Sequence, residues 1–144
     1  MKAVSIVLIA LLAAAFGLPA RAAEHIHVIE VASNEKVVPH GSAADSLGDL
    51  LVFTNPIKSA DGKVSIGLDR GYCVRTEVAR WWECRWTMQL PGGTLETAGS
   101  YPDAGDSEFA IVGGTGRYAG ARGTLKLHAR DPAKSSYDFV IDLL

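Results

Sequence analysis

The chain has 144 residues, of which 48% are hydrophobic, and its formal net charge is -2. This composition excludes an intrinsically disordered protein, and the nearly balanced charge excludes a strongly basic, nucleic-acid-binding surface. The basic residues from Arg75 to Arg85 are interleaved with Glu77 and Glu83, so they form no basic cluster. We therefore expect one globular domain with a sizeable core and no nucleic-acid partner.

The first residues have the pattern of a secretory signal peptide. A positively charged start precedes residues 3–18, which are almost entirely apolar, and an Ala-Arg-Ala sequence ends at Ala22. The apolar run is short for a transmembrane helix, and the small-residue cleavage motif follows it directly. We therefore predict a signal peptide over residues 1–22, one domain over residues 23–144, and a periplasmic or secreted mature protein with no membrane partner.

Beyond the predicted cleavage site, the dominant hydrophobic period is two, which is the period of β-strands. Turn-forming sequences such as Asn55-Pro56 and Asp61-Gly62 separate the alternating runs. No window shows a helical stripe, and residues 42–47 could form one helical turn at most. In chain order, the predicted strands cover His25–Val31, Asp49–Thr54, Lys63–Thr76, Trp81–Leu90, Thr94–Tyr101, Ser107–Val112, Gly123–Arg130 and Ser136–Leu143.

About eight short strands in one small domain have two common arrangements, a closed barrel and a sandwich. Gly67 and Gly71 lie inside a predicted strand, and sharply coiled barrel strands use glycine at their bends. We therefore predict an all-β fold, an eight-stranded antiparallel closed barrel. A barrel of this size holds either packed side chains or one small ligand.

A glycine-rich stretch could be mistaken for a nucleotide site. Residues 114–119 read GTGRYA, which matches the G-x-G-x-x-A form of the dinucleotide-binding motif. That motif needs a strand, a glycine turn and then a helix whose N-terminus faces the phosphates. Residues 122–130 alternate like a strand instead, and too few residues follow to complete a parallel sheet. We expect these glycines to provide positive φ and close backbone approach between barrel strands.

Four segments resemble the allene oxide cyclase and dirigent protein superfamily. They are GGTGRYAGARG at residues 113–123, SLGDLLVFTNPI at 46–57, IGLDRGYCV at 66–74, and the strand whose Trp-x-Cys sequence ends at Cys84. The resemblance implies a barrel with a hydrophobic lumen, usually trimeric, and it implies no cofactor. Plant cyclases of this superfamily close an unstable fatty-acid epoxide into a cyclopentenone, whereas dirigent proteins steer the coupling of phenoxy radicals.

The pocket residues of the cyclase branch can be matched one by one to positions in this sequence. Its pocket carboxylate corresponds to Glu30, and its pocket asparagine, at the end of an FTN sequence, corresponds to Asn55. Its pocket proline, cysteine and tyrosine correspond to Pro39, Cys73 and Tyr101. The resemblance therefore implies catalytic roles for Glu30 and Asn55, and ligand contacts for the other three.

One position departs from the cyclase pattern. Ala32 stands where the cyclases have an asparagine that helps to hold a water on the developing oxyanion, which argues against plant-type epoxide chemistry. The paired acidic residues of the dirigent branch are not assigned to positions in this chain.

Glu30 shares a strand face with Ile26 and Val28, so we expect it to point inward. A lone buried carboxylate is costly unless it is paired, and burial raises its pKa. Two interpretations stay open for Glu30: an acid–base or electrostatic role on a ligand, or a structural ion pair with a barrel-lining arginine such as Arg75. Asn55 could likewise contact a ligand or serve only as a turn residue before a proline.

Cys73 and Cys84 lie on consecutive predicted strands. If Val78 and Ala79 form the hairpin tip, the two cysteines are direct cross-strand neighbours within reach of a disulfide. An exported protein would permit that bond. The alternative is a free Cys73 that shapes the pocket wall.

Two tryptophans and two histidines also allow more than one interpretation. Trp82 and Trp86 share the inner face of their strand and could fill the core, line an apolar ligand cavity, or do both. His25 and His27 have a spacing that some metal sites use, but no further ligand lies at a supportive spacing. We predict a solvated strand edge there and no metal site.

These observations lead to one functional expectation and three alternatives. We expect a barrel that binds a small apolar or conjugated molecule and promotes its isomerisation or cyclisation, mainly by holding one conformer in a dry cavity. The alternatives are a non-catalytic lipocalin-like binding protein, a dirigent-like stereochemical guide, and a structural domain with a filled lumen. A homotrimer would use outward apolar residues such as Val74 and Trp81.

Overall fold

The computed structural model describes residues 23–144, so the predicted signal peptide lies outside the described residues. The described chain forms nine strands and one short 3₁₀ helix, η1 (Gly116–Tyr118). No helix in this part of the chain is long and apolar enough to cross a membrane. The strands are β1 (Glu24–Val31), β2 (Glu35–Val38), β3 (Leu50–Ser59), β4 (Ser65–Glu77), β5 (Trp81–Leu90), β6 (Gly93–Pro102), β7 (Ser107–Gly114), β8 (Gly123–Ala129) and β9 (Ser136–Leu143).

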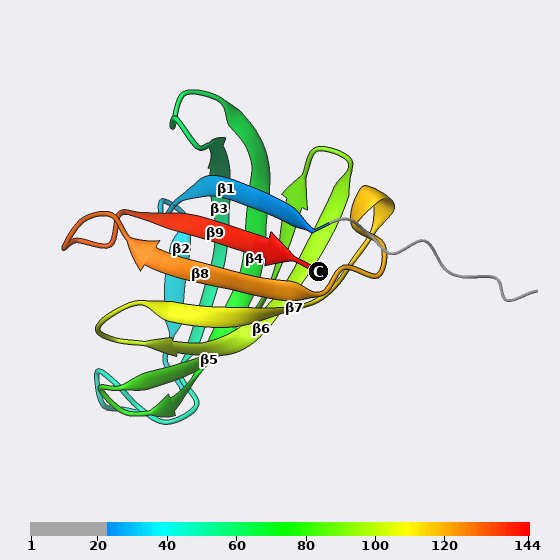
Figure 1. The fold of residues 1–144 in the computed structure, drawn as a ribbon. Helices are drawn as coiled ribbons and strands as arrows, with labels where there is room; N and C mark the ends of the chain where they lie inside the picture. Colours follow the sequence, from blue (N-terminus) through cyan, green and yellow to red (C-terminus); the bar gives the residue numbers. More distant parts are fainter. Residues whose placement is uncertain (1–22) are drawn as a thin grey trace, which may run out of the picture.

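All nine strands belong to one antiparallel sheet with the order β1-β9-β8-β7-β6-β5-β4-β3-β2 (Figure 1). An additional pairing between β1 and β3 closes eight of these strands into a barrel. The predicted eight-stranded closed barrel is therefore confirmed. The short strand β2 is an addition that the sequence analysis did not predict.

Strand β3 changes partner along one of its edges. Its first half pairs with β2, from Leu50 to Phe53, and its last residues pair with β1, from Ile57 to Ser59. Residues 54–56 lie between the two partners on that edge. Pro56 is tolerated there because a proline lacks the N–H that an uninterrupted ladder would need. The turn predicted at Asn55-Pro56 is therefore wrong, since both residues continue the strand.

The hairpin of β4 and β5 has the predicted register along most of its length. Cys73 stands opposite Cys84, and Arg75 stands opposite Trp82. A bulge then shifts the ladder so that Glu77 pairs with Trp81. The tip is consequently residues 78–80, with Ala79 at a φ of 57°, rather than the predicted pair Val78 and Ala79 alone.

The glycine-rich segment after β7 forms a tight turn and no nucleotide-binding helix. Gly116 has a φ of 59°, and a β-carbon there would stand 2.2 Å from the carbonyl oxygen of Gly92. Only a glycine, which lacks a β-carbon, therefore allows the backbone to lie this close to the β5–β6 turn. The helical turn considered for residues 42–47 is absent, because that segment consists of bends and turns.

One end of the barrel is filled by apolar side chains. Along β5, the inward side chains of Met88 and Leu90 are buried at this end, together with Leu95, Leu125 and Ile141. Nearer the other end, the inward residues Cys84 and Trp86 border an open space. Side chains therefore do not fill the lumen completely.

Candidate active site

The open part of the lumen is a cavity whose wall is mainly apolar and aromatic. The space that the centre of a water molecule can occupy is about 50 Å³, and the hollow with its mouth measures about 400 Å³. This is room for a few water molecules or for one small ring, and a longer ligand would extend through the mouth. The wall consists of Glu30, Glu35, Leu51, Phe53, Asp69, Cys73, Cys84, Trp86, Tyr101, Phe109, Leu127, Tyr137 and Phe139.

Two buried carboxyl groups meet in this wall. Glu30 on β1 is 5% exposed and Asp69 on β4 is 1% exposed. Asn55 on β3, the direct cross-strand partner of Asp69, donates a hydrogen bond of 2.7 Å from Nδ2 to Oε1 of Glu30. Asp69 has no hydrogen-bond donor of good geometry among the described residues. Two groups act on Asp69: the backbone N–H of Arg70, which lowers its pKa, and the carboxyl of Glu30. Two carboxyls can bond only by sharing a proton.

Burial and mutual repulsion keep a proton on this pair. Burial raises the pKa of Glu30 to about 7, although the hydrogen bond from Asn55 lowers it. Burial also raises the pKa of Asp69 well above its usual range, and the neighbouring charge of Glu30 raises it further. At neutral pH the pair therefore contains both a proton donor and a proton acceptor, which is the arrangement that general acid–base chemistry requires.

The orientation of the Asn55 amide is fixed by the backbone around it. Its Oδ1 accepts hydrogen bonds from the backbone N–H of Ser33 at 3.1 Å and of Asn34 at 2.9 Å. Since Oδ1 is occupied by two donors, only Nδ2 can face Glu30. The segment between β1 and β2 therefore positions the site through Asn55.

Two tyrosines and a lysine lie at the mouth. The hydroxyl groups of Tyr101 on β6 and Tyr137 on β9 are 3.0 Å apart, and Nζ of Lys134 donates to the Tyr101 hydroxyl at 2.8 Å. Both tyrosines line the cavity, and Tyr137 is the direct cross-strand partner of Glu30. Burial raises the pKa of Tyr137, and the bond to Tyr101 raises it further. Tyr137 is therefore a phenol at neutral pH.

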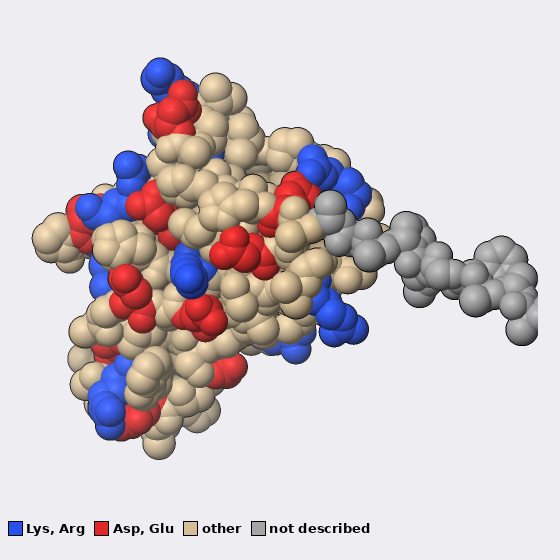
Figure 2. Space-filling model, in the orientation of Figure 1, with Lys and Arg blue, Asp and Glu red and all other residues tan. Residues whose placement is uncertain are grey.

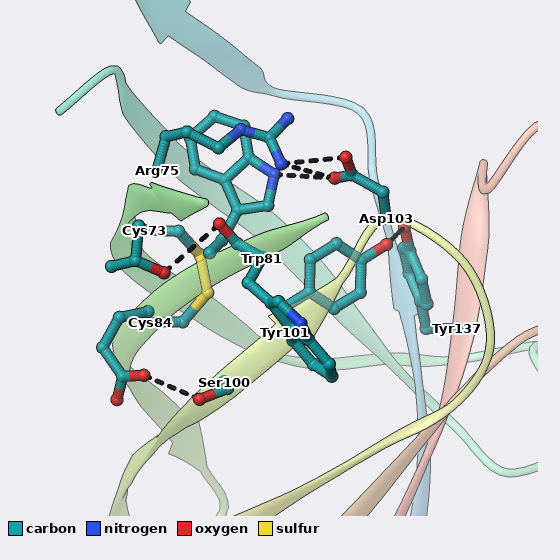
Figure 3. Close-up of a disulfide and its surroundings, with 11 residues drawn as sticks. Cys73, Arg75, Trp81, Cys84, Ser100, Tyr101, Asp103 and Tyr137 are labelled. Atoms are coloured by element: carbon teal, nitrogen blue, oxygen red, sulfur yellow. Dashed lines mark hydrogen bonds and ion pairs between the residues drawn. A yellow bond between two sulfur atoms is a disulfide. The ribbon is translucent and has the colours of Figure 1, made fainter. Parts of the chain in front are cut away.

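The cavity wall also includes a disulfide. The sulfur atoms of Cys73 and Cys84 are bonded at 2.04 Å, and both residues border the cavity (Figure 3). Cys73 therefore lies in the wall as a disulfide rather than as the free thiol of the alternative interpretation.

Comparison with known proteins identifies the family. The family model described as "Dirigent-like protein" matches residues 20–143. The chain belongs to the dirigent-like protein family. Among solved structures, it is similar to a pyocyanin demethylase, with 24% identity, a TM-score of 0.71, and coverage of 82% of this chain and 99% of that one. These matches show a shared fold.

Two further solved structures of similar fold are a dirigent protein and a Diels Alderase. One is the pterocarpan synthase dirigent protein PsPTS1, with 18% identity, a TM-score of 0.70, and coverage of 85% of this chain and 94% of that one. The other is the Diels Alderase AbmU from Streptomyces koyangensis, with 20% identity, a TM-score of 0.69, and coverage of 85% of this chain and 63% of that one.

In this dirigent-like barrel, Arg75 is not the partner of Glu30. Its Nη1 contacts Asp103 at 2.8 Å (Figure 3). Its Nε contacts Asp45 at 2.7 Å, and its guanidinium stacks 4.0 Å from the ring centre of Trp82. The structural ion pair considered for Glu30 is therefore wrong. Trp82 is buried, as expected, but it belongs to this cluster and does not line the cavity.

The remaining predicted site residues divide between the cavity and the surface. Trp86 lines the cavity and packs edge-on against Phe109, with ring centres 4.4 Å apart. Pro39 was expected in the pocket, but it is exposed in the segment after β2 and lies outside the cavity wall. The family resemblance placed it by its distance along the chain, and the irregular segment there does not point back into the barrel.

The two N-terminal histidines form surface contacts. His25 contacts Asp142 at 2.7 Å, and His27 contacts Asp138 at 2.8 Å, both across the ladder of β1 and β9. Within residues 23–144, no group of three or more His, Cys, Asp or Glu side chains could hold a metal ion. On the face drawn in Figure 2, acidic and basic side chains are interspersed and form no broad patch of one sign.

Sequence reasoning did not identify Asp69, Glu35 or Tyr137 as site residues. Asp69 lies inside the IGLDRGYCV segment that carried the family resemblance, and the alternation with Cys73 places both on one strand face. That alternation was a usable signal for a second inward carboxyl. The position of Tyr137 beside Glu30 required the barrel closure, because the two residues come from opposite ends of the domain.

Proposed function

We propose that this dirigent-like barrel binds a small, conjugated ligand in its lumen and promotes its isomerisation or cyclisation by proton transfer. The carboxyl pair of Glu30 and Asp69, buried at the edge of an apolar cavity, is the observation that carries the proposal. A pKa of about 7 for Glu30 suits a group that must both take and give a proton at neutral pH.

Each part of the site would have a distinct role. Glu30 takes a proton from one carbon of the ligand and returns it to another, so no oxidant or reductant is consumed. Asp69 keeps its own proton and donates it to Glu30; this hydrogen bond lowers the pKa of Glu30, which burial raises to about 7. Phe53, Trp86 and Phe109 hold the conjugated system and exclude water, which restricts the ligand to a reactive conformer.

A small probe substrate tests the proposal. Cyclohex-3-en-1-one converts to cyclohex-2-en-1-one when a proton moves from the α- to the γ-carbon, and NMR in D₂O follows both the conversion and the exchange of protons. Wild-type protein should accelerate the conversion. Glu30→Gln preserves the shape of the side chain and should slow it ~100-fold or more.

A matched surface variant provides the control. Glu108 on β7 is exposed on the outer face, so Glu108→Gln removes the same charge and should leave the rate unchanged. If wild-type protein binds such compounds but converts none, and Glu30→Gln binds them equally well, the catalytic proposal fails and a lipocalin-like binding protein is supported. Mass spectrometry of small molecules that co-purify with the protein would identify the natural ligand class.

We also propose that the protein is exported and begins near Ala23 after cleavage. The sequence of residues 1–22 motivates this, and the disulfide supports it because such bonds persist in oxidising compartments. Edman sequencing of protein recovered from outside the cytoplasm should begin near Ala23. Recovery of exported protein that still contains Met1 would contradict cleavage.

A further inference from the structure

The hydrogen bonds at the cavity mouth leave one phenol hydrogen without a partner. Lys134 can only donate, so the Tyr101 oxygen accepts at 2.8 Å. One of the two phenol hydrogens is used between Tyr101 and Tyr137. Whichever tyrosine donates in that bond, the other retains a hydrogen that has no acceptor among the described residues.

The position of Lys134 strengthens this free donor. Its ammonium group also donates to the backbone oxygen of Asp103 at 2.8 Å and lies 4.8 Å from the ring centre of Tyr101. A donor bond from a cation polarises the hydroxyl that accepts it, and a chain of hydrogen bonds transmits part of this effect. Tyr101 and Tyr137 therefore form a charge-supported phenol pair at the cavity wall.

We infer that Lys134, Tyr101 and Tyr137 form an oxygen-binding site, and that the ligand of this barrel carries a carbonyl oxygen that accepts the free phenol hydrogen. This inference rests on the ligand-binding part of the proposed function and requires no turnover. Lys134 is a positioning residue in it, because it acts on the ligand only through Tyr101.

The carboxyl of Glu30 lies where it could take a proton from the carbon next to the bound carbonyl. Tyr137 stands directly opposite Glu30 across the β1–β9 ladder, so an oxygen held by the phenols would place the adjacent C–H group near the carboxylate. When Glu30 takes that proton, the C–H electron pair forms a C=C bond and the carbonyl π electrons move to oxygen. The phenol hydrogen stabilises this oxygen, and return of the proton to the far carbon restores the C=O bond.

Binding of the conjugated product tests the inference separately from turnover. Cyclohex-2-en-1-one has the carbonyl, and cyclohexene is a ring of similar size without it. Wild-type protein should bind the enone at least ~10-fold more tightly than cyclohexene, and infrared spectroscopy should show a lowered C=O stretching frequency for the bound enone. The double variant Tyr101→Phe/Tyr137→Phe should lose both the preference and the frequency shift.

Variants of Lys134 separate its electrostatic effect from a structural role. Lys134→Met should reduce enone affinity ~3-fold and make the lowering of the C=O stretching frequency smaller. Lys134→Arg should keep the wild-type affinity and frequency. Lys126→Met and Tyr72→Phe change exposed residues on the outer surface and should alter neither. Thermal melting of each variant identifies any loss of folding.

Three results would overturn the inference. One is equal affinity of wild-type protein for the enone and for cyclohexene. Another is an unchanged frequency in the folded double variant. The third is a Lys134→Met variant that melts earlier but keeps the full frequency shift, which would make Lys134 a structural contact only. If enone binding behaves as expected while cyclohex-3-en-1-one is not converted, the proposed catalysis fails and the oxygen site stands.

Discussion

Gly71 on β4 lies directly opposite Trp86 on β5, and a β-carbon at Gly71 would stand 2.3 Å from the β-carbon of Trp86. The same β-carbon would be 2.4 Å from the backbone oxygen of Arg85. The missing side chain therefore allows the indole of Trp86 to lie across the barrel, where it forms part of the cavity wall.

We predict that Gly71→Ala destabilises the fold by about 3 kcal/mol, because the clash includes backbone atoms that cannot move away freely. The indole should shift, which tryptophan fluorescence would report alongside a urea midpoint. Gly113→Ala is the matched control, since a β-carbon at Gly113 meets no atom within 4 Å. Equal stability of the two variants would contradict this account of Gly71.

The buried carboxyl pair predicts how stability depends on pH. The pKa of Glu30 is raised from 4.5 to about 7 in the folded state, so the folded protein holds a proton that the unfolded chain releases. The free energy of unfolding should therefore fall as pH rises from about 4.5 to 7, by on the order of 3 kcal/mol for this group. Asp69 shifts in the same direction and adds to the loss.

Urea denaturation of wild-type protein and of Glu30→Gln/Asp69→Asn between pH 5 and pH 8 measures this effect. The neutral variant should gain stability relative to wild type as pH rises. Parallel pH profiles for the two proteins would show that the carboxyls are not titrating in the folded barrel.

Asn55 should control the titration of Glu30. Its hydrogen bond lowers the pKa of that carboxyl, so Asn55→Ala should move the Glu30 titration to higher pH. The variant should also lose ~1–3 kcal/mol of stability, because the backbone N–H groups of Ser33 and Asn34 lose their acceptor. Carbon-13 NMR of glutamate carboxyls would follow the titration. Asn34→Ala removes an exposed side chain while keeping those backbone groups, and its titration should match that of wild type.

The disulfide should stabilise the hairpin of β4 and β5. Cys73 and Cys84 are separated by 11 positions, and closing so short a loop in the unfolded chain contributes about 3 kcal/mol on the chain-entropy estimate. The urea midpoint of wild-type protein should fall when dithiothreitol is added. Cys73→Ala/Cys84→Ala should unfold at a similarly lowered urea midpoint and should not respond to the reductant. If dithiothreitol also lowered the midpoint of that variant, the fall in wild-type stability would not be due to the disulfide.

Self-association, expected as a trimer, is a prediction carried from the family resemblance. Outward residues provide apolar surface for it: Trp81 is 36% exposed, and Tyr72 on β4 is 45% exposed. Light scattering of the mature protein should give about three times the monomer mass at tens of micromolar. A monomer mass under those conditions would reject the prediction.

The barrel was predictable from the sequence because its strands alternate cleanly. Strand β5 has inward Trp82, Cys84 and Trp86 and outward charges, so its bounds and faces follow from a period of two. Strand β2 was missed because all four of its residues are exposed, which leaves no alternation to detect. The sequence predicts a turn at Asn55-Pro56 because that dipeptide usually marks one, and the change of partner along β3 explains why the strand continues there.

The site was predictable only in part, for a different reason. Glu30 and Asn55 were found through the family resemblance, and the structure joins them by a hydrogen bond. The contact of Glu30 with Asp69 and its place beside Tyr137 depend on which strands become neighbours when the sheet closes. A one-dimensional pattern gives the face of each residue but not the partner across the lumen.

The closure of the barrel has a consequence for the chemistry beside it. Strand β1 is held to β9 along eight residue pairs but to β3 by only three, and Glu30 belongs to the short ladder through its pairing with Ile57. Local separation of β1 from β3 therefore breaks the fewest residue pairs in the closed ring of eight strands, and amide hydrogens on this edge should exchange with solvent before those of β9. Each such opening would hydrate Glu30 and return its acidity toward that of a surface carboxylate. The pKa of Glu30 therefore depends on how often the three residue pairs between β1 and β3 separate.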